Sequence, residues 1–199
     1  MTSGSLVPDR RFLFLLASAR RDGNTEALAR RAAGSLRAQD EQEWLRLIDL
    51  DLAPFADMRH DAATGGVYPD PVGGARRLLD ATLAATDLVF ATPLYWFSLP
   101  ASAKLYLDHW SGWMRVPGLD FKARMAGKTM WALSAVSDED RSMADPLLGT
   151  LKLTCSYMNM GWGGSLLGFG NRPGDILNDV IACAAADKLF MEGKVASGL

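Results

Sequence analysis

The segment FLFLLASARRDGNTEALARRAA, residues 12–33, decides the fold of this chain. It begins with an uninterrupted apolar run, Phe12–Ala17, which is the pattern of a central strand of a parallel sheet buried on both faces. A polar turn follows, and apolar side chains then recur every fourth residue over Leu28–Leu36, which predicts a helix. Asn24 stands where the first turn of that helix needs a side-chain acceptor, so we expect it to be the N-cap.

A strand, a polar turn and a helix in this order bring backbone N–H groups and the positive end of a helix to one point, which suits a phosphate group. Hydroxyl, amide and guanidinium donors stand at the same place: Ser18, Arg20, Asn24 and Thr25. The turn is therefore a candidate phosphate site. The alternative is an ordinary strand-to-helix turn, because the segment does not match the glycine-rich phosphate fingerprints.

Length and composition indicate one globular domain over residues 1–199, in which the polar residues 1–10 are expected to be flexible. The net charge of −2 gives no reason to expect a nucleic-acid partner. No apolar run is long enough to span a membrane, and no signal peptide is visible. Cys155 and Cys183 lie in apolar helical patterns, which indicates buried free thiols in a reducing cytoplasm. With so few cysteines and histidines, we expect no metal site.

The rest of the chain alternates predicted strands with predicted helices. Further strands are expected at Glu43–Ile48, Asp87–Ala91, Lys128–Val136 and Trp162–Phe169. Further helices are expected from Asp70-Pro71 to near Thr86, around Leu99, Ala103, Tyr106, Trp110 and Trp113, from Asp145-Pro146 to about Met158, and from Asp175 to about Glu192. This alternation predicts an α/β three-layer sandwich, and five parallel strands favour the flavodoxin-like order 2-1-3-4-5.

A second candidate segment, TPLYWF at Thr92–Phe97, directly follows the third predicted strand. Ligands of such sheets bind beyond the carboxyl ends of the strands, where the first and third strands adjoin, so this segment and the phosphate turn are expected to share a cleft. Tyr95, Trp96 and Phe97 offer stacking surface to a planar ligand. The alternative is that these aromatic side chains pack on the next helix or in a subunit interface.

Two further features concern the chemistry of the site. The long segment Asp49–Pro71 is broken by proline and glycine, and a loop of this length is typical of functional loops. His109 falls among core-like aromatic residues, which favours a packed histidine over a catalytic one. No side chain stands out as a general acid or nucleophile, so we assign no catalytic residue.

The two segments together resemble a known family. ASARRDGNTEALA (17–29) resembles the phosphate loop of the NADPH-dependent FMN reductases in the flavodoxin-like superfamily. ATPLYWFSLPASAKLYLDHW (91–110) resembles the segment after the third strand in that family, and GKTMWALSAVS (127–137) is similar to its fourth strand. The likeness runs from about Phe12 to Phe190. The chain departs from the family pattern at Ala17 and Ala19, and at His109, where arginine is common.

The resemblance implies FMN as the cofactor and assigns residues to it. Ser18, Arg20, Asn24 and Thr25 would hold the phosphate of FMN. The isoalloxazine would be flanked by Pro93, Leu94, Tyr95, Trp96 and Phe97, and the ring or ribityl edge would contact Ser134, Ala135 and Val136.

The reaction implied by the resemblance is hydride transfer from NAD(P)H to FMN, followed by reduction of a small electrophile such as a quinone, nitro or azo compound. It also implies a homodimer, for which Trp110, Trp113 and Met114 are either an apolar patch or part of the core. One alternative is a flavodoxin-type electron carrier, although a net charge of −2 is small for such a protein. The other is a flavin-free regulatory or interaction domain that shares only the fold.

Overall fold

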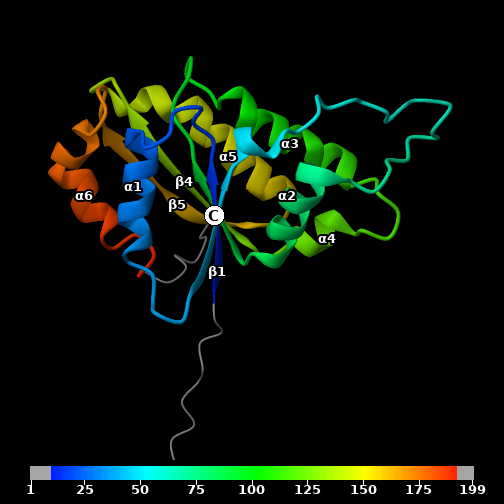
Figure 1. The fold of residues 1–199 in the computed structure, drawn as a ribbon, viewed down its shortest axis with the longest axis horizontal. Coiled ribbons are helices and arrows are strands. Elements are labelled where there is room, and N and C mark those ends of the chain that lie inside the picture. The colour runs from blue at the N-terminus through cyan, green and yellow to red at the C-terminus, as the bar shows by residue number, and fades with distance from the viewer. Residues whose placement is uncertain (1–9, 192–199) are drawn as a thin grey trace, which may run out of the picture.

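The computed structural model describes residues 10–191, which form a five-stranded parallel sheet (Figure 1). The strands are β1 (Arg11–Leu16), β2 (Glu41–Arg46), β3 (Asp87–Ala91), β4 (Thr129–Val136) and β5 (Gly161–Phe169). Their order is β2-β1-β3-β4-β5, and all neighbouring pairs are parallel. The predicted flavodoxin-like order 2-1-3-4-5 is confirmed.

Helices cover both faces of the sheet. One face carries α1 (Asn24–Ala33), η3 (Asp175–Asn178) and α6 (Val180–Ala186). The other carries α2 (Gly73–Ala84), α3 (Ala101–Trp113), α4 (Phe121–Met125) and α5 (Asp145–Tyr157). Figure 1 shows α1 and α6 together on one side and α2, α3 and α4 on the other. Two short 3-10 helices, η1 (Leu47–Leu50) and η2 (Arg141–Ala144), connect these elements.

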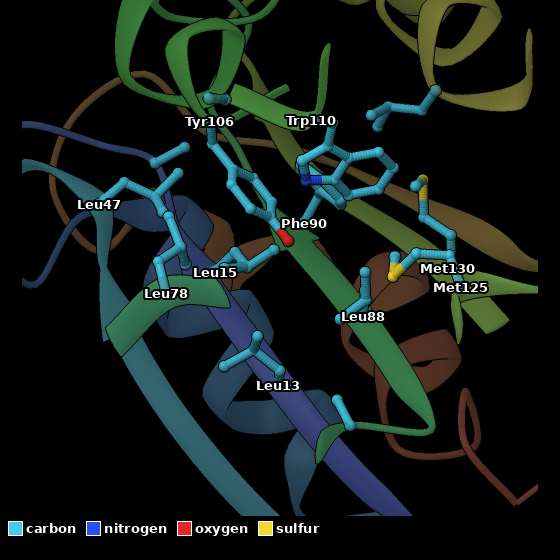
Figure 2. Packing of buried hydrophobic residues seen from close by; sticks show 14 of the residues in the cluster. Leu13, Leu15, Leu47, Leu78, Leu88, Phe90, Tyr106, Trp110, Met125 and Met130 are labelled. Atoms are coloured by element: carbon cyan, nitrogen blue, oxygen red, sulfur yellow. The ribbon is translucent and has the colours of Figure 1, made fainter. Parts of the chain in front are cut away.

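The apolar run of β1 explains why two cores form. Successive side chains of a strand point to opposite faces, so Phe12 and Phe14 pack under α1 and α6 while Leu13 packs under α2 and α3. Figure 2 shows the larger core, in which Tyr106 and Trp110 of α3 lie against the apolar side chains of the sheet. The Tyr106 hydroxyl lies 2.7 Å from Thr82 Oγ1, and burial raises the pKa of Tyr106 far above its ordinary value.

Several element boundaries differ from the predictions. The second strand is Glu41–Arg46 rather than Glu43–Ile48, because the chain turns into η1 at Leu47. Helix α2 begins at Gly73 rather than at the Asp70-Pro71 pair. A Cβ on the next residue, Gly74, would lie 1.6 Å from the carbonyl oxygen of Leu50, so a glycine is required where the start of this helix packs against η1.

The predicted final helix is interrupted. It is divided at Asp179 into η3 and α6, because the Asp179 carboxylate accepts hydrogen bonds from the N–H groups of Ala182 and Phe169 and so begins a new helix. The predicted end of this helix at Glu192 and the predicted flexibility of residues 1–9 lie outside the described residues.

The core also decides between the two alternatives for Trp110, Trp113 and Met114. Trp110 and Trp113 are each only 3% exposed, and Met114 packs against the same cluster, so the three residues belong to the core and do not form a surface patch. Both cysteines are free and buried, as predicted, and burial raises the pKa of the Cys155 thiol to about 12. Within residues 10–191 no helix is long and apolar enough to cross a bilayer.

Candidate functional site

The turns that follow β1, β3, β4 and β5 meet at the carboxyl edge of the sheet and enclose a cleft of about 210 Å³. Several of the residues that line it were predicted as site residues: Ser18, Arg20, Asn24, Thr25, Pro93, Leu94, Tyr95 and Ala135. The remaining lining residues are Gly23, Ser137, Gly170 and Asn171. The structure thus brings the two candidate segments of the sequence to one site, as the sheet order requires.

The turn after β1 presents donors to the cleft. The Ser18 hydroxyl oxygen accepts from the N–H of Arg20 at 3.1 Å, which leaves its own hydrogen available to a ligand. The guanidinium of Arg20 forms no hydrogen bond or ion pair with any residue between 10 and 191. Arg21 differs, because its Nη2 donates to both carboxylate oxygens of Asp49, at 3.0 and 2.9 Å. Of the arginine pair, Arg20 is therefore the one that lies at the cleft.

The N-terminus of α1 adds backbone donors. The first hydrogen bond of the helix runs from the N–H of Ala27 to the carbonyl oxygen of Gly23, at 2.9 Å, so the N–H groups of the three residues before Ala27 have no helical acceptor. Thr25 Oγ1 accepts from the N–H of Ala135 at 3.3 Å, which joins α1 to β4 and leaves the Thr25 hydroxyl hydrogen free. These groups suit an anion.

Asn24 is not the N-cap that the sequence predicts. Gly23 occupies that position, and no side chain caps the helix. The Asn24 amide instead donates to the carbonyl oxygen of Arg172 and accepts from the N–H of Gly174, each at 2.9 Å. It therefore ties the turn after β5 to the start of α1. A Cβ at Gly170 would lie 2.8 Å from this amide, which explains a glycine there.

The turn after β3 has an unusual backbone. Tyr95 and Ser98 exchange two backbone hydrogen bonds, at 3.1 and 3.0 Å, around a two-residue turn. Trp96 and Phe97 form this turn with φ of 50° and 63°, in the left-handed region that side chains larger than glycine rarely adopt. Pro93, Leu94 and Tyr95 line the cleft.

Trp96 and Phe97 do not line the cleft, and that they flank the isoalloxazine stays a prediction. Trp96 is 92% exposed and Phe97 is 51% exposed, because the left-handed turn directs them away from the sheet. The alternative that they pack on the following helix is not observed either.

The end of β4 contributes one side chain only. Ala135 lines the cleft, whereas Ser134 and Val136 are buried, since alternate residues of a strand face opposite sides of the sheet. The Ser134 hydroxyl has no hydrogen-bond partner within residues 10–191. The contacts of Ser134 and Val136 with the ring or ribityl edge that the resemblance implies stay a prediction.

The sequence reasoning missed a buried ion pair beneath the turn after β1. The Glu26 carboxylate accepts from Arg46 at 2.5 Å and from Arg30 at 2.7 Å. Burial alone would raise the pKa of Glu26, but the hydrogen bonds from Arg46 and Arg30 outweigh it and hold that pKa below its ordinary value. The predicted strand order indicated that the end of the second strand lies near this turn, because it places the second strand beside the first. Arg46 then pairs in register with Leu16, two residues before Ser18.

His109 is a packed and hydrogen-bonded residue, as predicted. Its Nε2 lies 3.0 Å from the carbonyl oxygen of Ala53, and its ring packs against Phe55 and Trp113. These contacts hold the long loop, drawn in cyan to blue-green in Figure 1, against α3. His109 does not line the cleft. Within residues 10–191 no cluster of three or more histidine, cysteine or acidic side chains is arranged to hold a metal ion.

Comparisons with known proteins agree with this geometry. Residues 10–188 match a family described by its flavodoxin-like fold. The chain is 35% identical over 172 residues to YwqN of Bacillus subtilis, which carries the name NAD(P)H-dependent FMN-containing oxidoreductase; the match covers 86% of this chain and 91% of YwqN.

Solved structures give the same fold. The Trp repressor binding protein from Bacillus subtilis aligns with a TM-score of 0.69 at 28% identity, over 90% of this chain and 97% of that one. An FMN-dependent NADH-azoreductase from Bacillus anthracis, solved with FMN, aligns with a TM-score of 0.62 over 90% of this chain and 99% of its own, and at 14% identity it supports the fold alone. The resemblance found in the sequence is thus confirmed, and the chain belongs to the flavodoxin-like family of NAD(P)H-dependent FMN reductases.

Proposed function

We propose that this chain binds FMN in the cleft and catalyses the NAD(P)H-dependent reduction of a small electrophile such as a quinone, nitro or azo compound. One observation carries the proposal: the two ends of the cleft differ in chemistry. Ser18, Arg20 and the start of α1 supply unpaired donors at one end, and Pro93–Tyr95 supply apolar and aromatic surface at the other. The name of the 35% identical relative supports the same activity.

The residues of the cleft fit FMN. A cavity of about 210 Å³ is smaller than the ~300–1,000 Å³ of typical ligand pockets, so it would enclose the phosphate-bearing end of the cofactor. The unpaired Arg20 guanidinium and the free N–H groups of α1 suit a phosphate, since both are donors without an internal acceptor. We propose Ser18, Arg20, Asn24 and Thr25 for the phosphate and Pro93, Leu94, Tyr95 and Ala135 for the rest of the cofactor.

FMN, when bound, supplies hydride and electron transfer between NAD(P)H and the acceptor. The residues of the chain bind and orient it. Ser18 and Thr25 keep free hydroxyl hydrogens for the phosphate, because both oxygens already accept backbone hydrogen bonds. The aromatic ring of Tyr95 gives the open side of the cleft a surface for stacking. We assign no catalytic acid or base.

We also propose that the protein is a cytoplasmic homodimer. Trp96 and Phe97, exposed beside the cleft, are apolar side chains that a second copy would cover. The two buried free thiols suit a reducing compartment. Sedimentation equilibrium tests the assembly: a mass twice that of the chain is expected, and a monomer at micromolar concentration would contradict it.

A visible absorption spectrum of the purified protein tests the function. We expect a flavin spectrum after addition of FMN, and bleaching of that spectrum when NADPH or NADH is added without oxygen. A bound flavin that neither nucleotide reduces would favour the electron-carrier alternative. Absence of binding in excess FMN would contradict the proposal and favour the flavin-free alternative.

A pair of arginine variants locates the site. Arg20→Ala is expected to weaken FMN binding about tenfold, since it removes a charge-assisted hydrogen bond. Arg21→Ala is the matched control, because the Arg21 side chain pairs with Asp49 and the substitution leaves the backbone N–H of residue 21 in place. Equal losses in both variants would show that the phosphate does not bind in this turn.

A further inference from the structure

Arg46, the last residue of β2, lies beneath the turn after β1 with a side chain only 10% exposed. One end of its guanidinium, Nη2, donates to the Glu26 carboxylate at 2.5 Å. The other, Nη1, donates to the carbonyl oxygens of Ser18 and Arg20, at 3.4 and 3.2 Å. A single side chain therefore fixes two alternate peptide groups of the turn.

The direction of these carbonyl groups determines the direction of the N–H groups beside them. In a planar trans peptide the N–H points opposite to the C=O, so the N–H groups of Ala19 and Arg21 point away from Arg46. Neither donates to any residue from 10 to 191. In the sheet, β2 flanks β1 on the side opposite β3, and the cleft lies on the side of β3 and β4. The two free N–H groups therefore point toward the side on which the cleft lies.

Glu26 completes the arrangement. Its carboxylate, 4% exposed, accepts from the N–H of Asp22 at 3.3 Å as well as from Arg46. Asp22 has a φ of 54°, which turns the chain into α1. The buried pair of Arg46 and Glu26 thus holds three alternate residues of the turn by their backbone groups. Turns that hold successive N–H groups toward one point are anion-binding concavities.

We propose that Arg46 is a positioning residue, which orients the N–H groups of Ala19 and Arg21 toward the phosphate of FMN without contacting the cofactor. This inference rests on the proposed function. It differs from a purely structural role, because the effect of Arg46 on binding depends on the phosphate and not on the rest of the flavin.

The test compares FMN with riboflavin, which lacks the phosphate. Both are titrated by flavin fluorescence into the flavin-stripped full-length protein, as the wild type, Arg46→Met and Arg30→Met. Arg30 is the matched control, since it pairs with the same Glu26 carboxylate at 2.7 Å but donates to no carbonyl of the turn. We expect Arg46→Met to weaken FMN binding by about tenfold or more and riboflavin binding by less than about twofold. Arg30→Met should leave both within about twofold.

Each outcome has a definite meaning. Wild-type protein that binds neither flavin would contradict the proposed function itself. Wild-type protein that binds FMN, with equal losses for FMN and riboflavin in Arg46→Met, would overturn the inference and leave the proposed function intact. Unchanged binding of FMN in Arg46→Met would overturn it as well.

Arg46→Lys covers the case in which Arg46→Met does not fold. Lysine retains the charge opposite Glu26, but it lacks the planar fork that reaches the carboxylate and two carbonyl oxygens together. We expect a folded protein by circular dichroism with an FMN-specific loss smaller than in Arg46→Met. An Arg46→Lys variant that prefers FMN over riboflavin as strongly as the wild type would overturn the inference.

Discussion

The turn after β1 and the turn after β3 line the same cleft but are held in place by different means. The first, residues 18–23, is fixed from outside: Arg46 and Glu26 bind its backbone, and Asn24 ties the following helix to the turn after β5. The second, residues 92–98, is fixed from within, by two backbone hydrogen bonds around a left-handed pair of residues. Its aromatic side chains contribute little to holding it.

This difference separates two ways of preparing a site before a ligand arrives. A phosphate needs several N–H groups at defined positions, and here distant charged side chains supply that order. A planar ring needs only a surface of suitable shape, and a local turn supplies it. Substitutions should therefore act at a distance in the first turn and locally in the second.

Glu26→Gln should have the largest effect on stability. Glutamine cannot neutralise Arg46, which would remain buried without its counter-charge, so the free energy of unfolding should fall by roughly 3 kcal/mol in urea denaturation. Glu41→Gln is the control, because Glu41 pairs with Arg11 at the surface and should change stability by less than about 1 kcal/mol. Similar small changes in both variants would mean that the buried pair does not organise the first turn.

The pair of Glu26 and Arg46 should also make the free energy of unfolding depend on pH in the acid range. The pKa of Glu26 in the folded protein lies below its ordinary value of 4.5, so its stabilising effect is fully present above pH 4.5 and is lost as pH falls through the folded pKa. The difference in unfolding free energy between wild type and Glu26→Gln should therefore narrow between about pH 5 and pH 3. A difference that stays constant over this range would exclude Glu26 as the titrating group.

The sequence predicts the strands and the strand order of this site better than the side-chain contacts that hold its turns in place. The apolar runs fix β1 and β3, since a parallel central strand tolerates few polar side chains, and Asp87–Ala91 agrees with the structure residue by residue. The strand order then places the two turns together. The pairing of Glu26 with Arg46 depends on how α1 packs against β2, and no local pattern encodes that distance.

Asn24 shows the same limit. Its position before an apolar helical pattern predicts an N-cap, but its amide finds acceptor and donor groups in the turn after β5, about 150 residues later. The sequence likewise identifies the aromatic residues of TPLYWF without predicting the left-handed turn that directs Trp96 out of the cleft. Tertiary contacts in one case and backbone conformation in the other decide where the side chain points.

After Glu26→Gln, Asn24→Ala should have the next largest effect on the free energy of unfolding. It removes two hydrogen bonds between the start of α1 and the turn after β5, so the free energy of unfolding should fall by about 2 kcal/mol. The amide of Gly174 should also exchange with solvent faster, as measured by hydrogen exchange. Asn171→Ala is the control, since Asn171 is exposed and its side chain forms no hydrogen bond with residues 10–191. Slow exchange at Gly174 in Asn24→Ala would show that the turn is held by other contacts.

The difference in stability between Trp96→Gly and Trp96→Ala should be the smallest effect, and it tests whether the second turn is held by its backbone alone. Both remove a side chain that is 92% exposed, so they differ mainly in the Cβ at a φ of 50°. Glycine adopts this conformation without strain, and we expect Trp96→Gly to be more stable than Trp96→Ala by about 0.5 kcal/mol in thermal unfolding.

At Gly149 in α5 the opposite order of stability is expected, with alanine more stable than glycine. A Cβ there would meet no atom within 4 Å, and alanine is favoured over glycine in a helix by ~1 kcal/mol, so Gly149→Ala should stabilise the protein.

FMN affinity should change by less than about twofold in both Trp96 variants, because Trp96 does not line the cleft. If Trp96→Ala were as stable as Trp96→Gly but bound FMN much more weakly than the wild type, the indole would act on the ligand. The second turn would then share the dependence on side chains that marks the first.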